Sequence, residues 1–127
     1  MGNPFVHVEL MSTDLDKAKS FYARMFQWEL EDMPGGEGDY TLIKVGDGTG
    51  GGMMRNPIPG APSMWMPYVL VENLQEATRK AQSLGAKLKK DVTEVPEMGA
   101  FTIITDPAGG MLGLWETAMG GGQQQRY

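Results

Sequence analysis

Hydrophobic and polar positions follow the same order twice along the chain, with an offset of 59 residues. Shifting residues 1–57 onto residues 60–116 places Asp14 on Asn73 and Met25 on Leu84. The hydrophobic positions stay in phase without a net insertion, which indicates two tandem copies of one supersecondary unit. A unit of about 60 residues buries too little surface to be stable alone, so we expect both copies to pack into one domain.

The first copy begins with an alternating segment at residues 5–11, which predicts a strand. One face of this strand is apolar and is expected to meet a helix; its residues are Val6, Val8 and Leu10. The other face must meet something else and carries Phe5, His7, Glu9 and Met11. Further strands are predicted at residues 28–32, 39–45 and 51–55, with a turn at 34–38.

A helix is predicted between the first two strands of this copy. Apolar residues recur there at spacings of 3, 4 and 3, namely Leu15, Ala18, Tyr22 and Met25. This spacing is typical of an amphipathic helix of about three turns. Thr13 and Asp16 resemble a capping box at its start.

The second copy repeats this order. A strand is predicted at residues 66–71, followed by a helix that ends at Gly85, where glycine suits a C-cap. The remaining strands are predicted at 87–95, 100–105 and 111–116. Each copy therefore reads βαβββ. We predict a single domain over residues 1–116, with module one at 4–57, a proline-rich linker, module two at 63–116, and a flexible tail at 117–127.

Composition restricts the function. The 127-residue chain carries a net charge of −5 with its basic residues scattered, so nucleic acid and membrane surfaces are poor partners. There is no cysteine, which excludes disulfides and thiol chemistry and suits a cytoplasmic protein. No basic segment precedes a long apolar run, so neither a signal peptide nor a membrane span is predicted.

Three segments resemble the vicinal oxygen chelate superfamily, which includes glyoxalase I, extradiol dioxygenases, fosfomycin-resistance transferases and bleomycin-binding proteins. They are the run HVELMSTDLDKAKSFYARMFQW from His7, the run MPYVLVENL from Met66, and the run DPAGGMLGLWE from Asp106. The resemblance implies an α+β fold in which two tandem βαβββ modules form a curved eight-stranded sheet cup with the helices outside. It also implies a homodimer, sometimes with modules swapped between chains.

Metal-using members of this superfamily take ligands from three strands, and the resemblance carries these positions to His7, Met66 and Glu116. His7 and Glu116 suit a divalent metal ion, whose identity stays open. Met66 interrupts the set because a thioether is a soft, uncharged ligand. Glu9 lies on the same strand face as His7 and is a candidate catalytic base or replacement ligand.

Strand alternation adds candidates for a ligand-binding lining. If His7 faces the cup, then Glu9 does too, and the repeat adds Met66 and Tyr68. Alternation back from Glu116 selects Leu114 and Leu112. The candidate substrate-binding residues are Met53, Arg55, Met66, Tyr68 and Leu114. Structural roles stay open for the same side chains, including an ion pair of Glu9 with Arg55, a core role for Tyr68, and a hydrogen bond of His7 inside the barrel.

Two functions follow. One is a metal-free, small-molecule-binding protein of the glyoxalase or bleomycin-resistance type, which Met66 favours. The alternative is a divalent-metal-dependent lyase, isomerase or dioxygenase, which the pair of His7 and Glu116 favours, with Glu9 as base. The residues identify neither the substrate nor the metal, and we expect the first function.

Overall fold

A computed structural model describes residues 2–33 and 40–118 of the chain. The turn predicted at 34–38 lies outside the described residues. In chain order the elements are β1 (Phe5–Ser12), α1 (Leu15–Met25), β2 (Glu29–Met33), β3 (Tyr40–Lys44), β4 (Gly51–Arg55), β5 (Met64–Leu70), α2 (Leu74–Ser83), β6 (Lys87–Val95), β7 (Gly99–Thr105) and β8 (Met111–Thr117).

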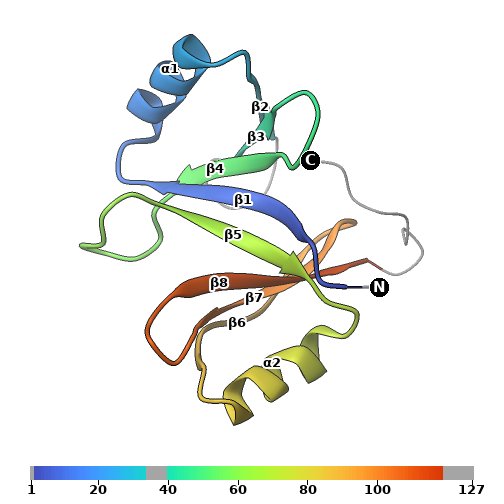
Figure 1. Cartoon of the computed structure of the whole chain (residues 1–127). Coiled ribbons are helices and arrows are strands. Elements are labelled where there is room, and N and C mark those ends of the chain that lie inside the picture. Colours follow the sequence, from blue (N-terminus) through green and yellow to red (C-terminus); the bar gives the residue numbers. More distant parts are fainter. Residues whose placement is uncertain (1, 34–39, 119–127) are drawn as a thin grey trace. The chain divides into compact units, whose positions relative to one another are not determined.

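The described residues form two compact units. The N-terminal unit comprises residues 7–66, and the C-terminal unit comprises residues 2–6 together with 67–118. The strand order is β2-β3-β4-β1 in the former and β5-β8-β7-β6 in the latter. In each unit the first and last strands of the module pair in parallel and the other neighbours are antiparallel (Figure 1). The predicted α+β fold of tandem βαβββ modules is confirmed.

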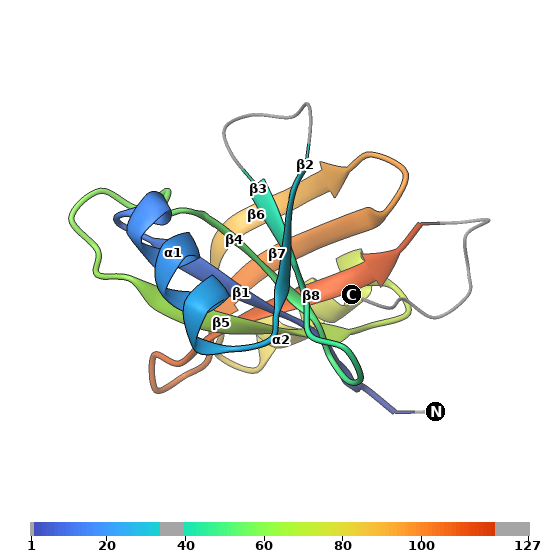
Figure 2. The ribbon, with the colours of Figure 1, turned by 90° about the horizontal axis from the view of Figure 1, so that it is seen from above.

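The core of the N-terminal unit lies between α1 and one face of its sheet. Leu10, Leu15, Ile43 and Met53 are each at most 4% exposed and pack together there. Both views place α1 on one side of β1 and β4 (Figure 1 and Figure 2). Because side chains alternate along a strand, the residues next to these in sequence face the opposite, helix-free side.

The core of the C-terminal unit has the same construction. Leu74 of α2 packs against Ile104 of β7 and Leu114 of β8. A buried hydrogen bond of 3.0 Å between the hydroxyls of Thr78 and Thr102 also joins α2 to β7. The first three members of each helix stripe face their own sheet, namely Leu15, Ala18 and Tyr22 in α1 and Leu74, Ala77 and Ala81 in α2. The last members, Met25 and Leu84, are exposed, so the predicted stripes extend one residue too far.

The two helices begin with equivalent caps. Asp14 accepts a hydrogen bond from Lys17 N at 3.1 Å, and its repeat partner Asn73 accepts one from Glu76 N at 3.0 Å. The predicted cap at Thr13 is one residue early, because Asp14 is the N-cap and the Thr13 hydroxyl is hydrogen-bonded to Ser63 Oγ at 3.2 Å instead. A carboxylate reaches the third helical N–H better than the preceding threonine does.

The chain divides into these units between residues 6 and 7 and between 66 and 67, inside strands β1 and β5. The module bounds expected from the sequence stay predictions. In the C-terminal unit, Leu70 N donates to Pro4 O at 2.9 Å, which ties the first residues to β5. Strand β8 runs to Thr117, one residue beyond the predicted end of the domain.

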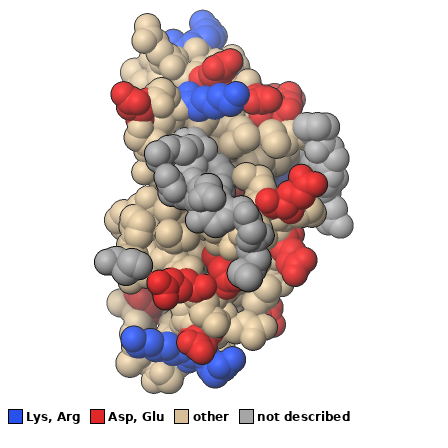
Figure 3. Space-filling model, turned by 90° about the vertical axis from the view of Figure 1, so that its right-hand side faces the viewer, with Lys and Arg blue, Asp and Glu red and all other residues tan. Residues whose placement is uncertain are grey.

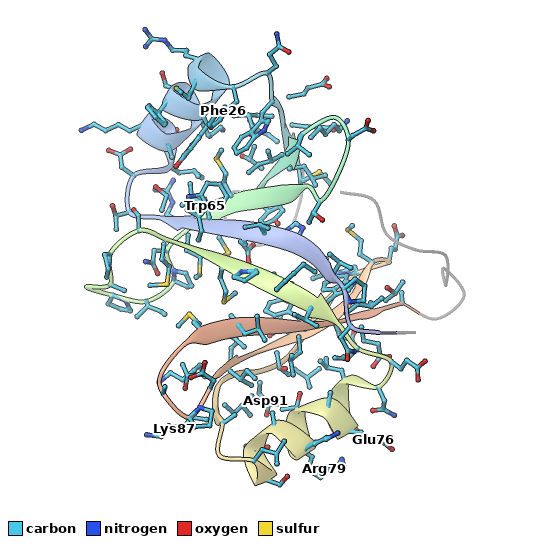
Figure 4. The ribbon with its side chains drawn as sticks, in the orientation of Figure 1. Phe26, Trp65, Glu76, Arg79, Lys87 and Asp91 are labelled. Carbon is cyan, nitrogen blue, oxygen red and sulfur yellow. The ribbon has the colours of Figure 1, made fainter. Side chains whose placement is uncertain are left out.

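Charges of both signs are interspersed on the face of the molecule in Figure 3, with no continuous basic area. On the C-terminal unit, Glu76 and Arg79 from α2 and Lys87 and Asp91 from β6 are all exposed (Figure 4). This distribution agrees with the scattered basic residues of the sequence. None of the helices in residues 2–33 and 40–118 is long and apolar enough to cross a membrane.

Gly51 is required by the close approach of β4 to β1. A Cβ atom at this position would overlap the carbonyl oxygen of Val8, which is its register partner on β1. We expect Gly51→Ala to lower the free energy of unfolding by about 2–3 kcal/mol, since backbone must move to admit the methyl group.

Urea denaturation checks this prediction, with Gly2→Ala as the control because nothing lies within 4 Å of a Cβ built at Gly2. Equal stability of the two variants, within about 0.5 kcal/mol, would contradict it.

Candidate functional site

Chemistry-bearing side chains gather on the helix-free face of the N-terminal unit. Leu10 faces α1, so alternation turns His7 and Glu9 to the other side of β1. Ile43 likewise faces α1, which turns Tyr40 to the helix-free side of β3. There His7 Nε2 is hydrogen-bonded to the Tyr40 hydroxyl at 2.8 Å. The structure thus confirms the face predicted for His7 and Glu9 and adds a tyrosine.

Burial controls the charge of His7. Desolvation lowers the pKa of its imidazole from 6.5 to about 4, so the ring is neutral at neutral pH. A neutral ring nitrogen can accept the phenolic proton of Tyr40 or donate its own. The carboxyl group of Glu9 lies in the same strand, and the residue is only 5% exposed. The face therefore combines a neutral imidazole, a phenol and a buried carboxyl group.

A glycine makes room for Tyr40. Gly52 on β4 pairs with Glu9 on β1, and a Cβ at Gly52 would overlap the Tyr40 hydroxyl. The phenol can thus pass over β4 toward His7 only because this position has no side chain. The Gly50-Gly51-Gly52 run, which superficially suggests a phosphate loop, allows close approaches to β1 and Tyr40.

The helix-free face of the C-terminal unit is built in a similar way but is aromatic. Tyr68 on β5 pairs with Gly113 on β8, and its ring occupies the space that a Cβ at Gly113 would need. Phe101 meets Tyr68 edge to face, with ring centroids 5.7 Å apart. Trp115 is the register partner of Phe101. Tyr68 is 4% exposed, so it packs with the aromatic side chains that the sequence left as its alternative role.

Three predicted lining residues face the helices instead. Met53 lies in the core beneath α1, and Leu114 lies in the core beneath α2. Glu116 Oε1 accepts a hydrogen bond from Leu74 N at 2.7 Å, at the beginning of α2. The expectation that these side chains face the same side as His7 or Tyr68 in their units is wrong. The prediction counted alternate residues back from Glu116, which faces α2 and not the helix-free side. It therefore selected Leu114, which lies on the helix side as well, and the 59-residue repeat transferred the same error to Met53.

The two other predicted residues lie elsewhere. Met66 is fully buried in β5, two residues before Tyr68 and thus on the same face of that strand. Arg55 is exposed at the end of β4, where it pairs with Ser12. Their proposed contacts with a ligand stay predictions.

The residues do not fit the implied divalent metal. In the described part of the chain no group of three or more His, Asp or Glu side chains could hold an ion. His7 Nε2 is engaged by Tyr40, and a Glu116 oxygen is engaged by α2. Met66 offers only a thioether, which binds hard or borderline divalent ions poorly. We therefore derive no chemical step through a metal at these residues.

A hollow of about 270 Å³ lies at the end of the C-terminal unit's sheet, around the β6–β7 turn. Its lining includes Glu94, Glu97, Gly99, Glu116 and Thr117. The carboxylates make it acidic. Glu116, whose Oε1 caps α2, is the member of this hollow that the sequence singled out.

Comparison with known proteins identifies the family. The family described as "Glyoxalase/Bleomycin resistance protein/Dioxygenase superfamily" matches residues 5–114. The chain belongs to this superfamily. The resemblance inferred from the three sequence segments is thereby confirmed.

Curated relatives of this glyoxalase-superfamily chain occur in mycobacteria. The proteins named "Putative glyoxylase CFP32" from Mycobacterium bovis and Mycobacterium tuberculosis are each 30% identical to it over 115 residues. This alignment covers 86% of the chain but 44% of each relative. The chain therefore spans about half the length of the curated relatives it matches.

Solved structures support the fold. Methylmalonyl-CoA epimerase from M. tuberculosis has a TM-score of 0.67 at 18% identity, covering 90% of this chain and 87% of that one. Hypothetical protein BH1468 from Bacillus halodurans has a TM-score of 0.69 at 12% identity, with both chains covered completely. At these identities the similarity concerns the fold alone.

Tyr40 is the residue of the candidate site that sequence reasoning missed. Its signal is the alternation of β3, in which Tyr40 and Leu42 share one face and Thr41 and Ile43 the other. Alternation alone does not reveal that Gly52 on β4, the strand between β3 and β1, lets the phenol of Tyr40 reach His7. That information requires the register of β3, β4 and β1.

The pKa of His7 predicts a pH dependence of stability. Its folded pKa of about 4 lies below the unfolded value of 6.5, so between these values the unfolded chain binds a proton that the folded chain does not. The free energy of unfolding is therefore expected to fall as the pH drops from 6.5 toward 4, by up to about 3 kcal/mol.

Chemical denaturation of the wild type and His7→Gln across this range measures the effect. His7 is the only histidine in the chain, so the variant retains just the contribution of the carboxyl groups. If the free energies of unfolding of the two proteins run parallel across this pH range, His7 has the same pKa in the folded and unfolded chain and the prediction is wrong.

Proposed function

We propose that the protein binds a small organic molecule against the helix-free face of its N-terminal unit, without a metal ion at His7 and Glu116. The observation that carries the proposal is the partly buried hydrogen bond between His7 and Tyr40 beside the buried Glu9. Membership of a superfamily of small-molecule-binding proteins supports it. A few convergent polar groups in an apolar surround are typical of small-molecule sites.

Apolar side chains from two strands surround these polar groups. Met11 follows Glu9 on the same face of β1, and Met54 follows Gly52 on the same face of β4. Methionine adapts its shape to different ligands. We propose that these side chains contact the apolar part of the ligand, while Glu9 and Tyr40 bind its polar groups.

Each polar group of the site favours a different kind of group on the ligand. A Glu9 carboxylate accepts hydrogen bonds, so it favours a hydroxyl or amine on the ligand. The Tyr40 hydroxyl can donate a hydrogen bond either to the neutral His7 ring or to a ligand oxygen. A glyoxalase-type or other proton-transfer reaction could use this pair, with Glu9 as the base predicted from the sequence. We restrict the proposal to binding.

Tyr68 is the repeat partner of Glu9 and also faces the helix-free side of its own unit. Ligand contacts of Tyr68, Met66 and Arg55 stay predictions from the sequence. The homodimer and the cytoplasmic location expected from the sequence also stay predictions.

Two probes follow from the superfamily's description, bleomycin and the hemithioacetal of methylglyoxal with glutathione. We expect isothermal titration calorimetry to detect binding of at least one of them. Glu9→Gln and Tyr40→Phe should each weaken that binding about tenfold or more, which corresponds to about 1.4 kcal/mol. Binding weakens because each substitution leaves a hydrogen-bonding group of the ligand without its partner in a buried site.

Glu29→Gln is the matched control, because Glu29 is an exposed carboxylate on β2 of the same unit. Binding that is equal in all three variants, or binding of neither probe, would refute the proposal.

The metal-free part of the proposal has its own measurement. We expect mass spectrometry of the purified protein to find much less than stoichiometric Zn, Ni, Mn or Fe. Glu116→Ala should lower the free energy of unfolding by about 1 kcal/mol, through loss of its bond to the start of α2, and equally with and without a chelator. A stoichiometric metal that both His7→Gln and Glu116→Ala release would restore the metal-dependent alternative.

A further inference from the structure

The loop that joins β3 to β4 contains the dipeptide Asp47-Gly48 (Figure 1). Among all the aspartates and asparagines of the chain, Asp47 alone is followed by glycine. This order matters chemically, because the backbone nitrogen of a glycine has no Cβ beside it to shield it. Such a nitrogen can approach the side-chain carboxyl group of the preceding residue and close a five-membered ring with it.

The structure leaves both reacting groups accessible. Asp47 and Gly48 are exposed, and nothing lies within 4 Å of a Cβ built at Gly48. No other described residue is hydrogen-bonded to the Asp47 carboxylate or to the Gly48 backbone nitrogen. Gly48 has a φ of 104°, which L side chains rarely adopt, so glycine is the residue that suits this position. A loop with so few restraints reaches the ring-closing geometry at a low free-energy cost.

The equivalent loop of the second copy is protected from the same reaction. The repeat places Asp47 on Asp106 and Gly48 on Pro107, and proline has no backbone N–H to lose. The Asp106 carboxylate accepts hydrogen bonds from Gly110 N at 2.9 Å and Ala108 N at 2.8 Å. These bonds also lower the pKa of the Asp106 carboxyl group, which favours the unreactive carboxylate form. The chain thus contains one accessible and one protected aspartate at matching positions.

We propose that Asp47 is a site of spontaneous isomerisation to isoaspartate. The Gly48 nitrogen attacks the carbon of the protonated Asp47 carboxyl group, and the hydroxyl group leaves as water with the amide proton. The resulting succinimide ring then takes up water at either carbonyl, which breaks one of its two C–N bonds. Opening at the side-chain carbonyl restores aspartate, whereas opening at the main-chain carbonyl gives isoaspartate. The sequence of steps consumes and returns one water and needs no other reactant.

Isomerisation would act on the strand that follows the loop. Isoaspartate adds one methylene group to the backbone, just before β4 begins at Gly51. Val8 N donates to Gly50 O at 3.1 Å, and Gly51 lies so close to Val8 that no side chain fits. A longer backbone at this point displaces the first contacts between β4 and β1. The modified chain should therefore be less stable, and its exposed isoaspartyl group is a substrate for a carboxyl methyltransferase specific for that group.

Incubation of the purified full chain at neutral pH and physiological temperature for several weeks tests the proposal. An isoaspartate-specific methyltransferase with labelled S-adenosylmethionine detects the product, and mass spectrometry of tryptic peptides locates it. Trypsin cleaves after Lys44 and Arg55, so the peptide 45–55 contains Asp47 as its sole aspartate. We expect label to accumulate with time in this peptide and not in the peptide that contains Asp106.

Substitutions at the two matching positions provide the controls. Asp47→Glu should abolish the label, because the six-membered imide that glutamate would need forms much more slowly. Asp47→Asn should accelerate labelling severalfold at neutral pH, since an amide loses ammonia without first taking up a proton. Asp106→Asn should add no label, because Pro107 still lacks an N–H. Absence of label from peptide 45–55 of the wild type, or equal labelling of Asp47→Glu, would overturn the proposal.

Urea denaturation measures the structural consequence. We expect the aged wild type to unfold at a lower urea concentration than the fresh protein, in proportion to the isomerised fraction. Asp47→Glu aged in the same way should unfold as its fresh form does. A labelled wild type with an unchanged midpoint would show that the loop absorbs the extra methylene group and would refute the effect on β4. The site lies outside the candidate ligand face, so these results are independent of the ligand-binding experiments.

Discussion

The parallel pairing of the first and last strands of each module is the constraint on which the rest of the structure depends. It brings β1 against β4 and β5 against β8, with Gly51 so close to Val8 that no side chain fits. Once this register is set, alternation decides the side on which every residue lies. One side is sealed by the helix, and the opposite side is left for other contacts.

The same constraint accounts for the tyrosine on each helix-free face. Tyr40 lies over Gly52 in the N-terminal unit, and Tyr68 lies over Gly113 in the C-terminal unit. The chemistry of the two faces nevertheless differs. The first contains a neutral imidazole and a carboxyl group, whereas the second contains aromatic rings. The two copies share one scaffold, but the imidazole, the phenol and the buried carboxyl group lie in the first copy.

Much of this arrangement could be predicted from the sequence, because hydrophobic spacing reflects local geometry directly. The bounds of β4 and β6, the first three members of each helix stripe and the helix-free face of β1 all follow from it. The failures arose where a long-range register was needed. Counting from Glu116 put Leu114 on the wrong side, since a carboxylate at the end of a strand can equally well satisfy a nearby helix N-terminus. A one-residue shift of this kind reverses every side chain of a strand.

The distribution of tryptophans gives the two units separate optical signatures. Trp28 and Trp65 meet edge to face in the N-terminal unit, with ring centroids 6.3 Å apart, whereas Trp115 is 8% exposed on β8 of the C-terminal unit. Two indoles at this separation couple their electronic transitions, while a single buried indole emits at short wavelength. Circular dichroism of the indole pair therefore reports the folding of the N-terminal unit, and a Trp28→Phe, Trp65→Phe background leaves an emission that belongs to the C-terminal unit alone. The duplicated chain thus carries an intrinsic means of observing whether its two halves unfold together.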